Sequence, residues 1–115
     1  MNRSLKKFAK SNGLKIQHKT ATGTLQSHAV TISEGKEFVK IHLATYFDDA
    51  NKQQDFEEGL NRKLLSHDLR VLEQTYSPTG ISTTLSYRQS ADIAHVEAFV
   101  NYFFPMLTQH GAVRT

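Results

Sequence analysis

The stretch EFVKIHLATYF, at residues 37–47, alternates apolar and polar side chains and decides the fold class. In an extended chain, alternate residues point to opposite faces of the sheet. The apolar side carries Val39, Ile41 and Leu43, and the other side carries Phe38, Lys40, His42 and Tyr46. The segment 24–32 alternates in the same way, and SEGK at 33–36 is a turn sequence with glycine available for a positive φ. The two segments therefore predict an antiparallel hairpin with one apolar face.

On the N-terminal side of this hairpin, the sequence predicts a short amphipathic helix over 2–12 and a first strand over 14–17. The apolar stripe of the helix consists of Leu5, Phe8 and Ala9. These residues recur at helical spacing, while lysines take the opposite side. Ser4 is the expected N-cap and Gly13 the expected C-cap. A helix this short is marginal alone, so we expect its stripe to pack against the sheet.

On the C-terminal side of the hairpin, the sequence predicts a second helix and a second hairpin. The helix opens at Asp48–Asp49, where carboxylates complement the helix dipole, and ends near residues 66–68. The turn sequence SPTG at 77–80 joins two strands expected over 69–76 and 81–88.

A last helix rich in phenylalanine is expected to begin at Ser90 as its N-cap. Pro105 lies inside its apolar pattern and is expected to kink the helix or to end its regular part. Gly111 is the expected terminator, and residues 112–115 are expected to fray.

The resulting element order is α-β-β-β-α-β-β-α. Antiparallel hairpins followed by helices predict an α+β fold, with a sheet of about five strands and helices packed mainly on one face. A length of 115 residues corresponds to a single domain, which we place over 1–115.

Composition excludes several classes of protein. The chain contains no cysteine, which excludes disulfides, thiolate zinc sites and cysteine nucleophiles within it. No apolar run has the length of a bilayer span, and the polar N-terminal segment lacks the apolar stretch of a signal peptide. With 38% hydrophobic residues the chain has enough material for a core. We therefore expect a soluble, cytoplasmic protein.

The charge is distributed unevenly along the chain. The first 24 residues hold six basic side chains and no acidic one, a formal charge of +6, whereas the remaining residues hold eight basic and eleven acidic side chains, a formal charge of −3. The six basic residues are Arg3, Lys6, Lys7, Lys10, Lys15 and Lys19. Such a segment is a candidate contact for a polyanion, either a nucleic acid or an anionic membrane surface. The alternative interpretation of these basic residues is an ordinary solvated helix face.

No pattern in the sequence indicates catalysis. None of the six histidines has the helical spacing of a zinc motif, and a pair formed by His28 and His42 across the hairpin lacks a third ligand. The chain has no nucleophile elbow and no glycine-rich phosphate loop, and the carboxylate pairs at 48–49 and 57–58 are read as a helix start and a solvated helix face. We therefore expect a protein that is not an enzyme, with no metal, no cofactor and no identifiable small-molecule ligand.

The remaining candidate is a surface. The less apolar face of the sheet is the candidate binding face, and it consists of Lys40, His42, Tyr46, Ser82, Thr84 and Arg88. An open antiparallel face of this kind pairs subunits or binds a protein partner. The sequence therefore predicts a non-catalytic interaction or assembly domain that forms a homodimer, with polyanion binding through the basic segment as the alternative.

The element order resembles that of type III secretion chaperones, a similarity of fold from which no residue role follows. Several short motifs are similar to the N-terminal soluble domain of an uncharacterised family from Gram-positive bacteria. They are LKKF at 5–8, NGLKI at 12–16, TGT at 22–24, TGIS at 79–82 and LTQHGA at 107–112. This second resemblance implies no activity, and it implies a bacterial domain at the cytoplasmic side of a longer, membrane-attached protein.

Overall fold

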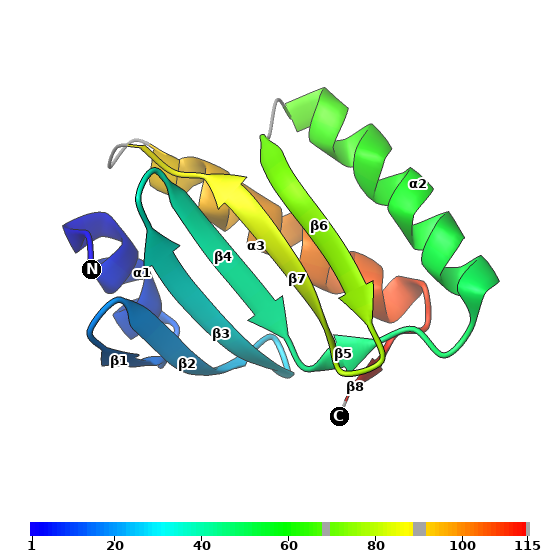
Figure 1. The fold of residues 1–115 in the computed structure, drawn as a ribbon, viewed down its shortest axis with the longest axis horizontal. Helices are drawn as coiled ribbons and strands as arrows, with labels where there is room; N and C mark the ends of the chain where they lie inside the picture. The colour runs from blue at the N-terminus through cyan, green and yellow to red at the C-terminus, as the bar shows by residue number, and fades with distance from the viewer. Residues whose placement is uncertain (68–69, 89–91, 115) are drawn as a thin grey trace.

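A computed structural model describes residues 1–67, 70–88 and 92–114. Among these residues, six antiparallel strands form one sheet in the spatial order β1-β2-β3-β4-β7-β6 (Figure 1). The strands are β1 (Lys15–Gln17), β2 (Thr20–Leu25), β3 (His28–Gly35), β4 (Phe38–Leu43), β6 (Val71–Ser77) and β7 (Gly80–Ser86). The second hairpin thus adds to the first one through pairing of β7 with β4.

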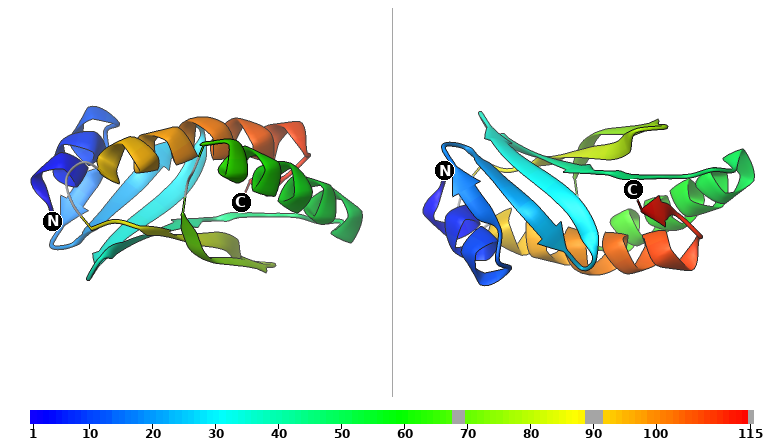
Figure 2. Two further views of the ribbon diagram at one scale, coloured as in Figure 1. Left: turned by 90° about the horizontal axis from the view of Figure 1, so that it is seen from above. Right: turned by 90° about the horizontal axis from the view of Figure 1, so that it is seen from below.

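Three helices lie on one side of the sheet (Figure 2). They are α1 (Arg3–Ser11), α2 (Ala50–His67) and α3 (Ile93–Gln109). Their apolar sides and the inner sheet face form the core, in which Phe56 of α2 contacts Phe103 of α3 edge to face, with ring centroids 5.4 Å apart. Val39, Ile41 and Leu43 are fully buried, as their alternation predicts. The α+β class, the element order and the helices on one face are therefore confirmed.

The sheet has six strands rather than about five, because the strand expected over 24–32 is two strands. The chain reverses at Gln26 and Ser27, which have φ values of 48° and 69°. Glycine, asparagine or aspartate usually occupies such positions, so these two residues gave no turn signal in the sequence. In the β3–β4 turn, similarly, Glu37 rather than the expected Gly35 has the positive φ, 63°.

The N-terminus of α1 is held by side chains from distant parts of the sheet. Asn2, rather than the expected Ser4, is the N-cap, and its Oδ1 accepts a hydrogen bond from the Ser4 backbone N–H at 2.9 Å. The Tyr87 hydroxyl donates to the same oxygen at 2.9 Å, and the backbone N–H of Asn2 donates to Glu34 at 2.9 Å. Gly13 follows the helix with a φ of 73°, the left-handed conformation expected there.

Helix α2 begins after Asp49, whose carboxylate accepts hydrogen bonds from the backbone N–H groups of Asn51 and Lys52 at 2.7 and 3.3 Å. This is the expected helix start. Gly59, in its middle, faces α3: a Cβ placed there would lie 3.1 Å from the Met106 side chain. The glycine therefore allows the two helices to approach closely.

The C-terminal segment differs from the expectation. Helix α3 continues past Pro105 to Gln109, so the proline does not end it, and Gly111, at a φ of 76°, follows as the expected terminator. Residues expected to fray form β8 (Val113–Arg114), which pairs with β5 (Thr45–Tyr46) in a second, two-stranded sheet. This pairing satisfies backbone groups that would otherwise need solvent. The expected N-cap Ser90 and the terminal Thr115 lie outside the described residues.

Within the part of the chain that the structure describes, no helix is long and apolar enough to span a bilayer.

Candidate functional site

The outer face of the sheet is not covered by any described helix (Figure 2). Four of the predicted face residues meet on it through the pairing of β4 with β7. In the register of β4 and β7, Lys40 lies opposite Thr84, and His42 lies opposite Ser82. The imidazole Nδ1 of His42 is 2.7 Å from the hydroxyl oxygen of Ser82, a hydrogen bond that fixes the ring on the face. These side chains are half-buried apart from Lys40, which is exposed.

Hydroxyl groups extend this polar face on both sides of the four residues. On β3, Ser33 lies opposite Lys40 and Thr31 opposite His42, and on β6 Glu73 and Thr75 lie opposite Thr84 and Ser82. The face is thus composed of small hydroxyl side chains around one lysine and one histidine, with the carboxylate of Glu73 on β6.

One aromatic ring lies at the end of this face. Phe38 is 36% exposed and pairs with Gly35 across the β3–β4 hairpin and with Ser86 of β7. A Cβ at Gly35 would lie 2.0 Å from the Phe38 ring, so the ring rests directly on the glycine backbone. The alternation in the sequence places Phe38 on this side of the strand, but Phe38 is not among the residues of the predicted binding face. We define the open face as Phe38, Lys40, His42, Ser82 and Thr84.

Two predicted face residues lie elsewhere. Tyr46 belongs to β5, because the strand expected over 37–47 ends at Leu43 and the chain then joins the second sheet. Arg88 follows the end of β7, where its backbone N–H donates to the Asp92 carboxylate at 2.6 Å. Neither residue is in the strand pairs that form the open face.

His28 is a core residue rather than a partner of His42. The register pairs His42 with Thr31, and His28, which is 2% exposed, points to the inner face. Its Nδ1 is 2.9 Å from the Thr45 hydroxyl oxygen, and its ring packs edge to face on Phe104. Burial lowers the pKa of His28 below its ordinary value, and the positive charge of Arg114 lowers it further. His28 and His42 therefore do not face each other across the hairpin.

Among the described residues, no three histidine, aspartate or glutamate side chains are grouped as metal ligands would be.

The six basic residues of the N-terminal segment do not form one surface. Four of them lie on α1, where Arg3, Lys6, Lys7 and Lys10 line a shallow hollow and are exposed. Lys15 is on β1, opposite Thr22 on the outer side of the sheet, and Lys19 lies in the β1–β2 turn. The positive surface is therefore the exposed side of one helix.

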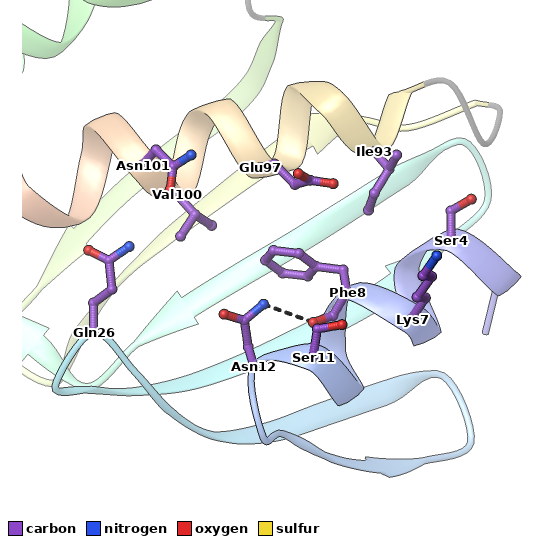
Figure 3. Close-up of a pocket in the computed structure, with 10 residues that line it drawn as sticks. All are labelled: Ser4, Lys7, Phe8, Ser11, Asn12, Gln26, Ile93, Glu97, Val100 and Asn101. Carbon is purple, nitrogen blue, oxygen red and sulfur yellow. Dashed lines mark hydrogen bonds between the residues drawn. The ribbon is translucent and has the colours of Figure 1, made fainter.

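A groove lies between α1 and the first half of α3 (Figure 3). Phe8, Ile93 and Val100 provide its apolar surface, while Lys7 and Glu97 stand on opposite sides. The groove encloses about 510 Å³ and is otherwise lined by hydroxyl and amide side chains. Pockets of this size accept small molecules in other proteins.

A second groove, which the sequence did not reveal, opens between α2 and the edge strand β6. Its lining consists of Glu57, Leu60, Asn61, Leu64, Val71, Leu72, Glu73, Gln74 and Tyr76, and it encloses about 770 Å³. We call it the edge groove. Leu72 on its rim is 58% exposed, the largest exposure among the large hydrophobic side chains described. Apolar spacing indicated the helix and the strand separately, but the space between them depends on how α2 packs against α3.

No family model, curated protein or solved structure matches this chain. The two resemblances described above stay predictions.

Proposed function

We propose that this protein is a non-catalytic assembly domain that forms a homodimer through the open face. The observation that carries the proposal is the exposed Phe38 ring at the end of an uncovered, hydroxyl-rich sheet face. Aromatic rings supply much of the binding energy of protein interfaces, and the surrounding polar groups supply the hydrogen bonds. A two-fold contact uses the same surface on both copies, so one face is sufficient.

The composition of the face favours contact with another sheet face over binding of a small ligand. The side chains around Lys40 and His42 are short, so two such faces approach closely without large voids. Phe38 provides an apolar contact, and Lys40 finds hydroxyl acceptors on the second copy. Lys40 is the charged side chain of the open face, and the carboxylate of Glu73 lies on the same side of the sheet, opposite Thr84.

Size-exclusion chromatography with multi-angle light scattering tests the proposal. We expect a mass of twice 13.0 kDa for the natural chain at high concentration and 13.0 kDa for Phe38→Asp. Arg62→Glu, a charge change on the exposed side of α2, serves as the matched control and is expected to stay dimeric. A natural chain that stays monomeric at high concentration contradicts the proposal, and so does a dimer that Phe38→Asp leaves intact.

Polyanion binding through α1 is the second candidate function. The observation that favours it is that Arg3, Lys6, Lys7 and Lys10 share one exposed surface of a single helix. Counterion release makes such binding strongly salt-dependent, with a slope of about 0.9 in log K against log salt for each duplex phosphate contacted.

The test is a salt titration of duplex binding with the natural chain and with the triple variant Lys6→Glu, Lys7→Glu, Lys10→Glu. The variant is expected to lose binding, and the slope of the natural chain is expected to be about 3 to 4 if all four side chains contact phosphates. The triple variant binding as tightly as the natural chain contradicts this candidate.

A further inference from the structure

We propose that the edge groove binds an extended segment of another protein, which adds a strand to β6 and carries apolar side chains alternating with basic ones. This inference goes beyond the proposed homodimer, because it concerns a different surface and a different partner.

Strand β6 forms a free edge of the six-stranded sheet. Strand β6 pairs with β7 on one side, and no described strand pairs with it on the other. The backbone N–H and C=O groups on that side are available to an added strand, which is a common mode of peptide recognition. A bulge between Val71 and Glu73 interrupts the regular pairing at the start of β6. We therefore place the added strand along the regular part, residues 73–77.

Two residues that line the groove, Gln74 and Tyr76, have buried polar atoms whose hydrogen-bonding capacity is not satisfied. Among the described residues, the Tyr76 hydroxyl oxygen and Nε2 of Gln74 are buried, and apart from a contact with each other they have no hydrogen-bond partner. The other amide atom of Gln74, Oε1, accepts from the Thr83 hydroxyl. The tyrosine hydroxyl and the amide NH2 group carry three protons between them. A hydrogen bond between the two groups uses one of these protons, so at least two still lack an acceptor. Backbone carbonyl groups of an incoming strand supply such acceptors.

The lining of the groove combines apolar surface with negative charge. Leu60, Leu64, Val71 and Leu72 provide apolar lining from both elements. The two charged lining residues, Glu57 and Glu73, are both acidic. A partner segment with apolar side chains toward α2 and a basic side chain near these carboxylates complements both features.

A second copy of this chain is a poorer occupant than a foreign segment. A two-fold contact through the edge groove would bring the acidic residues of both copies into one interface, and like charges across an interface oppose association.

Fluorescence polarisation with a defined peptide tests the inference. The probe is a fluorescein-labelled peptide of seven residues, the length of β6, in which valine alternates with lysine. One comparison peptide has glutamate in place of lysine, and another has N-methyl groups on alternate peptide nitrogens. We expect saturable binding of the lysine peptide, binding of the glutamate peptide weaker by about fivefold or more, and loss of binding on N-methylation.

Protein variants locate the binding site. Glu73→Lys is expected to weaken binding of the lysine peptide about fivefold, whereas Glu58→Lys, an exposed charge reversal outside the groove lining, leaves it unchanged. Tyr76→Phe is expected to weaken binding about fivefold and to change the melting temperature of the free protein little, because in the free protein the hydroxyl has no recorded partner other than the Gln74 side chain.

The outcomes are decisive in both directions. The inference is overturned if the lysine peptide does not bind saturably. It is also overturned if the lysine and glutamate peptides bind equally, or if binding survives N-methylation. Phe38→Asp is expected to leave peptide binding unchanged, so that failure of the edge groove and failure of the proposed dimer are distinguishable.

Discussion

Lowering the pH is expected to destabilise this protein through His28. The imidazole is 2% exposed, contacts the Thr45 hydroxyl at 2.9 Å and packs on the Phe104 ring. Protonation places a positive charge in this enclosed site, near the guanidinium of Arg114. Both burial and that charge lower the pKa of His28 from its ordinary value of 6.5. The neutral form is therefore the one compatible with the fold.

The direction of the effect follows from the protons bound in the two states. Between the lowered pKa of the folded state and 6.5, the unfolded chain binds a proton at His28 that the folded chain does not bind. The free energy of unfolding therefore falls as the pH falls through this window, and it is fully restored above about pH 6.5. One such group contributes at most about 1.4 kcal/mol per pH unit.

The assay is urea unfolding followed by circular dichroism between about pH 5 and pH 8, with the natural chain and His28→Asn. Asparagine retains a polar atom near Nδ1 but does not titrate. We expect the natural chain to lose up to about 1.4 kcal/mol per pH unit below pH 6.5 relative to this variant. His18→Asn, at an exposed turn position, is the control and is expected to behave as the natural chain does.

Equal pH dependence in the natural chain and in His28→Asn would refute this reasoning. Should the variant fail to fold, the imidazole of the natural chain can be titrated directly by nuclear magnetic resonance. A pKa for His28 at or above 6.5 would contradict the account as clearly.

Two further substitutions test how the fold is held together. Asn2→Ala removes the N-cap of α1 and the acceptor of the Tyr87 hydroxyl. Urea unfolding is expected to show a free energy of unfolding lower by about 1–2 kcal/mol. An unchanged free energy would mean that α1 is held by its apolar stripe alone. Gly80→Ala places a Cβ in collision with the Leu43 carbonyl oxygen and the His42 ring. We expect the free energy of unfolding to fall by about 1–3 kcal/mol and the His42 signal to shift in nuclear magnetic resonance spectra. An unchanged free energy of unfolding would mean that β4 and β7 are further apart at this point.

The parts of the fold that could be predicted from sequence are those in which local pattern and burial agree. Residues 37–43 alternate in step with the pleat, so the inner face of β4 follows directly from the sequence. The turn at 77–80 and the helix start at Asp49 also follow, because their residues have strong conformational preferences. Lys40, His42, Ser82 and Thr84 share one face for the same reason.

The parts that were missed depend on tertiary contacts. Gln26 and Ser27 adopt positive φ values without glycine, which means that pairing of β2 with β3 overrides local preference. Tyr46 leaves the predicted face because β5 pairs with the C-terminal β8, which no local pattern reveals. The edge groove is a space between α2 and β6, and its existence depends on the packing of α2 against α3.

Protection of an introduced thiol gives the most direct test of the central claim, that the open face is the self-association interface. The natural chain contains no cysteine, so a single substitution gives an unambiguous label. Thr84→Cys places a thiol within the open face, and Gln54→Cys places one on the exposed side of α2. The account predicts that maleimide reacts more slowly with the thiol at position 84 as the protein concentration rises, while the rate at position 54 stays constant. The account is contradicted if light scattering shows dimers and the rate at position 84 nevertheless stays constant as the protein concentration rises.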